Sequence, residues 1–134
     1  MNKAAITVVF VSIFSPPLLE GFDGGESPTK QAKISEFMQY KQKLAHEVFD
    51  AIILNDFKRI SKNANLLVTL SKAAEFQVHK TPSYLQHSSE FQSAAARMAQ
   101  NARDQNQDGT TLAFMKLTLS CVHCHEYIRQ HHRQ

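Results

Sequence analysis

The stretch Cys121-Val122-His123-Cys124-His125 lies near the C-terminal end of the 134-residue chain and has the pattern C-x-x-C-H. On an α-helix, residues three and four positions apart lie on the same face, so Cys121, Cys124 and His125 face one direction. Apolar side chains continue this face before and after the motif. They are Phe114, Leu117 and Ile128. We therefore expect one helix to present two thiols and an imidazole beside an apolar wall.

This pattern is typical of covalent c-type haem attachment. Two thiols add across the two vinyl groups of a haem, and the adjacent imidazole ligates the iron. The chain has only these two cysteines, so none is left for a structural disulfide. We predict that Cys121 and Cys124 hold one haem c covalently and that His125 is an iron ligand.

Two other kinds of site use the same residues. A zinc site is one alternative, because four candidate ligands share this face of the helix. They are Cys121, Cys124, His125 and His132. Three ligands within one helical turn strain a tetrahedral site, and structural zinc ligands normally come from separate elements. A dithiol redox pair is the other alternative, but such a pair usually opens a helix after a strand, and no strand is expected here.

Residues 1–20 resemble a secretory signal peptide. Lys3 provides a basic start, residues 4–14 are mostly apolar, and Pro16-Pro17 ends any helix. The apolar run is shorter than the ~20 residues that span a bilayer. Residues 21–28 are expected to form a flexible leader. Bacterial haem attachment takes place outside the cytoplasm, so the two features together predict a periplasmic protein.

The start of the chain leaves two alternatives open. No clean A-x-A cleavage site follows the apolar run, so residues 1–20 are either a cleaved signal or an uncleaved N-terminal anchor. A buried N-terminal strand or helix is the other alternative. Membrane contact is expected only if the segment is uncleaved.

Residues 29–134 are expected to form one all-α domain, an antiparallel four-helix bundle. Low glycine and proline contents favour helices over strands. Apolar residues recur at spacings of three and four in four segments. We expect helices over residues 28–54, 57–74, 88–102 and 110–129. Caps are predicted at Ser27-Pro28, Asn55-Asp56 and Ser88-Ser89-Glu90.

Two other functions are disfavoured by composition and spacing. Asp104–Gly109 begins like a calcium-binding EF-hand loop, but its twelfth position, which must be glutamate, is Met115. We expect a polar turn there. The net charge is +3, without a cluster of basic and aromatic residues, so no nucleic-acid partner is expected.

A four-helix bundle whose last helix bears C-x-x-C-H near the C-terminus resembles the class II cytochromes c, the cytochrome c′ family. The resemblance covers roughly residues 28–129. Arg129 matches a basic residue that the family often carries one turn after the histidine. The family's aromatic residue just before it is Ile128 here, with Tyr127 one place earlier. Family members often form homodimers, although the sequence shows no exposed apolar stripe that demands one.

The resemblance also implies a second iron position on the first helix. In low-spin relatives a methionine occupies it, and counting back from the Asn55-Asp56 turn places this position near Phe37 or Met38. Met38 shares a helical line with Ala45, which leaves room for a flat macrocycle. Met38 is our candidate for the sixth ligand, with Met98 as its competitor; the other reading is that Met38 is core filler.

These inferences predict an electron carrier and not an enzyme, acting with redox partner proteins. A thioether ligand and an apolar pocket would both raise the reduction potential. The side chains expected to bury the ring are Phe37, Phe49, Phe114 and Leu117. Lys30, Lys33 and Lys41 are candidates for pairing with haem propionates or guiding an acidic partner. The alternative is a five-coordinate protein that binds NO or CO, in which Phe37 or another apolar residue caps an open site.

Overall fold

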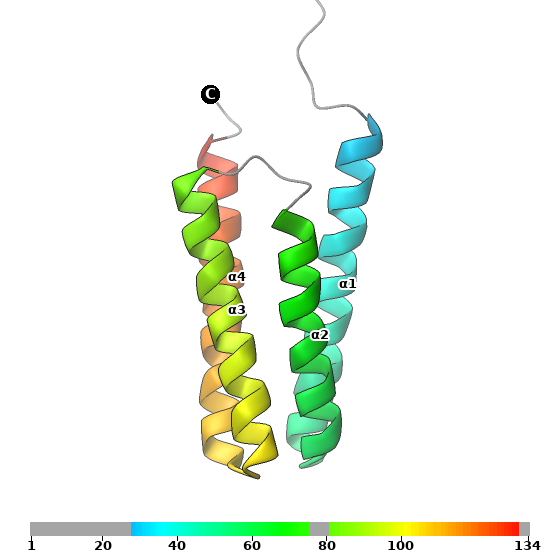
Figure 1. The fold of residues 1–134 in the computed structure, drawn as a ribbon, viewed down its shortest axis with the longest axis vertical. Coiled ribbons are helices and arrows are strands. Elements are labelled where there is room, and N and C mark those ends of the chain that lie inside the picture. Colours follow the sequence, from blue (N-terminus) through cyan, green and yellow to red (C-terminus); the bar gives the residue numbers. More distant parts are fainter. Residues whose placement is uncertain (1–27, 76–80, 132–134) are drawn as a thin grey trace, which may run out of the picture.

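The computed structural model describes residues 28–75 and 81–131, and this part of the chain contains four α-helices and no strand. They are α1 (Pro28–Ile53), α2 (Phe57–Glu75), α3 (Pro82–Arg103) and α4 (Gln107–His131). The helices run side by side (Figure 1), which confirms the predicted all-α, four-helix architecture. The predicted signal segment and residues 21–27 of the leader lie outside the described residues. None of the described helices is long and apolar enough to cross a membrane.

The turn between α1 and α2 has the predicted cap. Asn55 has a positive φ of 54°, the left-handed conformation in which many helices end. Oδ1 of Asp56 then accepts a hydrogen bond of 3.0 Å from the backbone N–H of Arg59. This bond satisfies one of the free N–H groups in the first turn of α2.

The turn between α3 and α4 repeats this geometry at Gln105, where φ is 53°. Asn106 takes the capping role, because its Oδ1 accepts a hydrogen bond of 2.9 Å from the backbone N–H of Gly109. Helix α4 therefore begins at Gln107, three residues earlier than predicted. A Cβ added at Gly109 would lie 2.5 Å from Nδ2 of Asn106, so close packing explains this glycine without calcium.

Helix α3 begins at Pro82, and the predicted cap at Ser88-Ser89-Glu90 is wrong. The hydroxyl of Thr81 accepts a hydrogen bond of 3.2 Å from the backbone N–H of Tyr84 and caps the helix. Proline at the first helical position costs nothing, because its missing N–H would have had no partner there. The Thr81-Pro82 pair is thus a helix start and not a break between helices.

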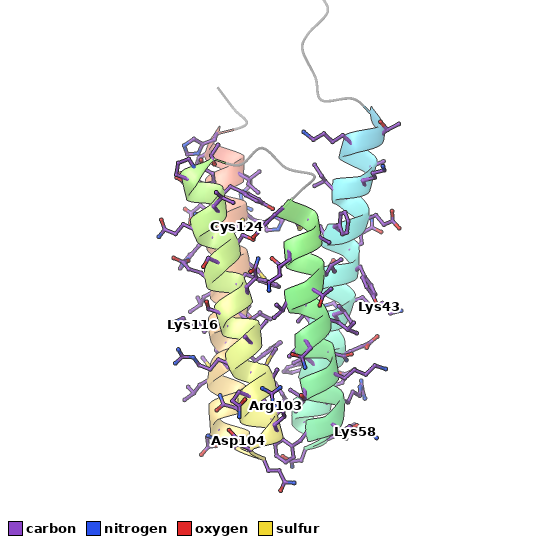
Figure 2. All side chains as sticks on the ribbon, viewed as in Figure 1. Lys43, Lys58, Arg103, Asp104, Lys116 and Cys124 are labelled. Atoms are coloured by element: carbon purple, nitrogen blue, oxygen red, sulfur yellow. The ribbon has the colours of Figure 1, made fainter. Side chains whose placement is uncertain are left out.

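The core lies mainly between α2 and α3 and extends to α4 and the C-terminal part of α1. Its largest fully buried apolar side chains are Val48, Ile60, Leu67, Met98 and Leu117. Buried alanines on α3 allow the helices to approach closely. Charged side chains such as Lys43, Lys58 and Lys116 point outward (Figure 2).

The four helices are not equally close to their neighbours. Helix α1 packs on α2, and α4 packs on α3, but α1 and α4 approach each other at far fewer positions than the other neighbouring pairs. This separation leaves an opening along one side of the bundle, and the face of α4 that carries the C-x-x-C-H motif borders it.

The outer face of α4 carries an apolar stripe that the sequence analysis did not identify. Leu112, Met115, Leu119 and Val122 are all more than half exposed. They recur at spacings of three and four residues, on the side of α4 opposite the buried Leu117.

Candidate functional site

A cavity of about 600 Å³ lies between α1 and α4, with residues of α2 and α3 forming its back wall. Apolar atoms make up most of its surface. Its volume is in the range of small-molecule and cofactor sites, which are typically apolar with a few polar groups.

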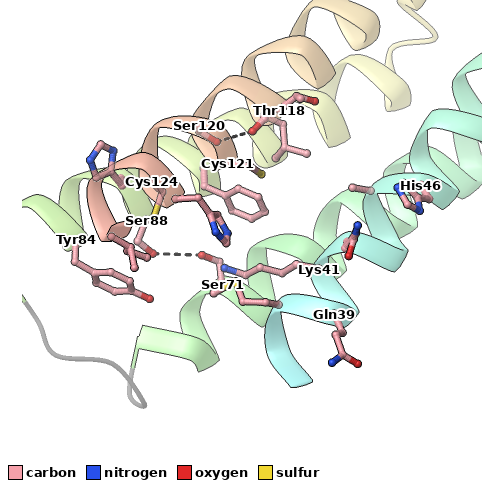
Figure 3. Close-up of a pocket in the computed structure, with 18 of the residues that line it drawn as sticks. Gln39, Lys41, His46, Ser71, Tyr84, Ser88, Thr118, Ser120, Cys121 and Cys124 are labelled. Carbon is pink, nitrogen blue, oxygen red and sulfur yellow. Dashed lines mark hydrogen bonds between the residues drawn. The ribbon is translucent and has the colours of Figure 1, made fainter. Parts of the chain in front are cut away.

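One wall of the cavity is the predicted face of α4. Cys121, Cys124 and His125 all line it, together with Phe114 and Leu117. Both cysteines are half-buried free thiols, and Figure 3 shows them on the part of α4 that borders the cavity. The helical spacing of the motif therefore brings two thiols and an imidazole to one apolar space.

Met38 lies on the facing wall, which is formed by α1. Ala45 lines the cavity two turns further along the same helix. Met98 is 0 % exposed within the core, and Met115 is 58 % exposed on the outer face of α4. Neither of them lines the cavity, so Met38 is the methionine of the described residues that can reach a ligand there.

Three residues predicted to contribute to the site do not line the cavity: Phe37, Phe49 and Arg129. Phe37 directly precedes the lining residue Met38, and Arg129 directly follows the lining residue Ile128. One step along a helix turns the side chain by about 100°. Phe49 is 52 % exposed and stacks on Phe114, with ring centroids 6.0 Å apart. Phe114 lines the cavity, whereas Phe49 does not.

Four further titratable residues line the cavity, and of these only Lys41 was a candidate from the sequence, for pairing with haem propionates. They are Lys41, His46, Tyr84 and His87. Lys41 follows Met38 by three residues, so the helical spacing that selected Met38 also predicts that Lys41 shares its face. Tyr84 and His87 belong to the first turns of α3, which the sequence analysis did not recognise as helix. His46 had no partner pattern in the sequence.

A cluster of polar side chains lies between α2 and α3 behind the cavity. Oε1 of Glu75 accepts hydrogen bonds of 2.6 Å from the Ser88 hydroxyl and from the Gln92 amide. The Ser88 and Ser71 hydroxyls lie 3.3 Å apart, and both line the cavity. The buried hydroxyls thus have partners within the fold.

Lys41 brings positive charge to the cavity. Figure 3 shows its side chain extending from α1 toward the side where Ser71 lies, and its Nζ is 4.7 Å from the centroid of the Phe91 ring. This is a cation–π distance. Burial lowers the pKa of Lys41, although negative charge on the two cysteines opposes this effect.

Burial raises the pKa of both cysteine thiols, and the positive charge of Lys41 opposes the rise. Burial also raises the pKa of Tyr84 to about 12. Redox-active cysteine pairs need thiolates with lowered pKa values, so the electrostatics at Cys121 and Cys124 are opposite to those of such a pair.

The zinc alternative depends in part on His132, which lies outside the described residues. In the part of the chain that the structure describes, no group of three or more histidine, cysteine, aspartate or glutamate side chains converges as a metal site. This described part of the chain includes the EF-hand-like stretch Asp104–Gly109, so no such group forms there either.

No family model matches this chain, and no curated protein or solved structure is significantly similar to it.

Proposed function

We propose that this chain is an exported c-type haem protein that carries single electrons and is related to the class II cytochromes c. In this proposal Cys121 and Cys124 hold the haem through thioether bonds. His125 on α4 and Met38 on α1 would ligate its iron.

The observation that carries the proposal is the placement of all four residues around one cavity. Two thiols and an imidazole line its α4 wall, and a thioether lines its α1 wall. The donor set suits a c-type haem, because cysteine sulfur, histidine nitrogen and methionine sulfur are its attachment and axial groups. The volume and apolar wall also suit a large, flat, mostly apolar cofactor.

When bound, haem would supply a one-electron redox couple. The chain's own part is to hold it, exclude water and set its potential. The soft thioether of Met38 favours the ferrous state, and the apolar side chains of Phe114 and Leu117 lower the local dielectric. Both effects raise the reduction potential. The proposal gives no side chain an acid–base role, so the protein is a carrier and not an enzyme.

Covalent attachment is tested by producing the chain with its N-terminal segment in a bacterium that matures c-type cytochromes. We expect a haem-stained band at the mass of the protein after boiling in detergent, because thioether bonds survive this treatment. The Cys121→Ala/Cys124→Ala double variant should lose the stain. His123→Ala is the matched control, because His123 lies within the motif but is exposed and does not line the cavity. An unstained wild-type protein would reject the proposal.

The ferrous spectrum with and without CO separates the two functional alternatives. Sharp low-spin bands that do not change with CO support His/Met coordination and electron transfer. Rapid uptake of CO by the wild-type protein supports the five-coordinate, gas-binding alternative and removes Met38 from the iron.

A further inference from the structure

Helix α1 has two parts that relate differently to the core. Four of the ten residues from 44 to 53 are buried: Leu44, Val48, Ala51 and Ile52. Among residues 32–43, all of which the structure describes, none is fully buried, although Ile34, Phe37, Met38 and Lys41 are half-buried. We call residues 32–43 the flap segment. Three turns of helix therefore continue beyond the last residue that α1 contributes to the core.

The flap segment supplies most of the α1 wall of the cavity. Ser35, Met38, Gln39, Lys41 and Gln42 line it. These residues face the cavity instead of the apolar core, so whatever fills the cavity provides the surface on which this half of α1 packs. The Lys41 ammonium over the Phe91 ring links the segment to α3.

In the stacked pair of Phe49 and Phe114, Phe49 lies within the anchored part of α1 (residues 44–53), just after the buried Val48. The pair joins this part of α1 to α4, and Phe114 also lines the cavity. The cavity lies between the flap segment and the α4 face that carries Cys121 and Cys124.

We infer that the flap segment is a lid, which opens where it joins the anchored part of α1, at residues 43–44, to admit a large, flat, mostly apolar cofactor to Cys121 and Cys124. The lid packs down only when the cofactor fills the cavity. A helix end that contributes no fully buried side chain to the core has little tertiary packing to stabilise it, and short isolated helices are marginal in water. This inference rests on the proposed function, because haem is the occupant on which the segment packs.

Hydrogen exchange measured by mass spectrometry tests the lid on the full-length chain with and without covalently attached haem. In the haem-free chain we expect residues 32–43 to exchange at least about tenfold faster than residues 44–53, because the segment opens locally. In the haem-bound protein we expect this difference to disappear. Equal protection of both parts of α1 in the haem-free chain would overturn the inference.

Two glycine substitutions provide an independent test. Glu36→Gly and Lys116→Gly each replace an exposed charged residue within a helix, so their intrinsic helix penalties are similar. In the haem-free chain Lys116→Gly should lower the urea midpoint, whereas Glu36→Gly should leave it unchanged. In the haem-bound protein Glu36→Gly should speed exchange of the flap segment. Equal shifts of the haem-free midpoint would show that the segment unfolds with the core.

The two proposals fail in different ways. A chain that acquires haem but has a protected flap segment beforehand refutes the lid alone. A chain that never acquires haem, and so gives no stained band, refutes the proposed function and the lid with it.

Discussion

The ring of Phe49 on α1 stacks on the ring of Phe114 on α4, with centroids 6.0 Å apart and planes inclined by 30°. This contact joins two helices that otherwise approach each other at few positions. Phe49 itself is half exposed, so its ring contributes little to the core. The position of α1 relative to α4 therefore depends more on this aromatic pair than on buried apolar side chains between the two helices.

We predict that the pair is energetically coupled. A double-mutant cycle with Phe49→Ala, Phe114→Ala and the double variant should give a coupling free energy of about 1 kcal/mol, typical of an aromatic pair. Urea unfolding of the four proteins measures it. Ile53→Ala is the control for Phe49→Ala, because Ile53 is 66 % exposed and has no such partner in the described residues. Additive single effects would contradict the coupling.

Met38→Ala should convert a low-spin haem protein into a high-spin one that binds CO, because the variant has no thioether on the α1 wall. The visible spectrum of the ferric and ferrous forms measures this change. Met115→Ala is the matched control, since Met115 is exposed on the outer face of α4. A spectrum that is unchanged by Met38→Ala would move the sixth ligand to another residue, with His46 the first to test.

Ser88→Ala should lower the free energy of unfolding by about 2 kcal/mol, because the Ser88 hydroxyl donates a 2.6 Å hydrogen bond to the Glu75 carboxylate. Ser89 is exposed, so Ser89→Ala should change the free energy of unfolding by no more than about 0.5 kcal/mol. Both variants gain the same helix propensity, so the difference between them measures the hydrogen bonds of the Ser88 hydroxyl. Equal urea midpoints for the two variants would show that this cluster contributes no stability.

The raised pKa of Tyr84 predicts that the folded protein loses stability in alkali. This pKa is raised from 10.0 to about 12, first by burial and then by the negative charges of Cys124 and Glu75. The unfolded chain therefore loses the phenolic proton before the folded chain does, and its ionisation favours unfolding. The contribution of Tyr84 is fully present below pH 10 and is lost as the pH rises toward about 12.

Urea midpoints measured between pH 9 and pH 12 test this linkage, and Tyr84→Phe should make the decline shallower. The same decline in both proteins would assign the alkaline instability to other groups.

The sequence predicts most of this fold because the helices are marked by local chemistry. Asp56 gives the start of α2, and apolar spacing gives the extent of α1 and α4. The start of α3 was missed because the Thr81-Pro82 pair is ambiguous: the same residues end one helix or cap the next. Ser88 looked like a cap but is buried against Glu75, a contact between residues of different helices.

The α4 wall of the cavity could be predicted, because Cys121, Cys124 and His125 are held by the spacing of a single helix. The α1 wall was harder, since it depends on how far α1 diverges from α4. Met38 was placed by counting from a turn, and it does line the cavity. Phe49 was predicted to bury the haem ring, but its side chain stacks on Phe114 and does not line the cavity.

The matching turns at Asn55 and Gln105 have a consequence for the architecture as a whole. They give α1–α2 and α3–α4 the same kind of tight connection, so the molecule consists of two helical hairpins. Small buried side chains such as Ser71 and Ser88, whose hydroxyls lie 3.3 Å apart, allow α2 and α3 to approach closely. Helices α1 and α4 do not approach each other in this way, so the cavity lies between them. The cavity therefore arises from unequal packing of the helices and needs no dedicated loop.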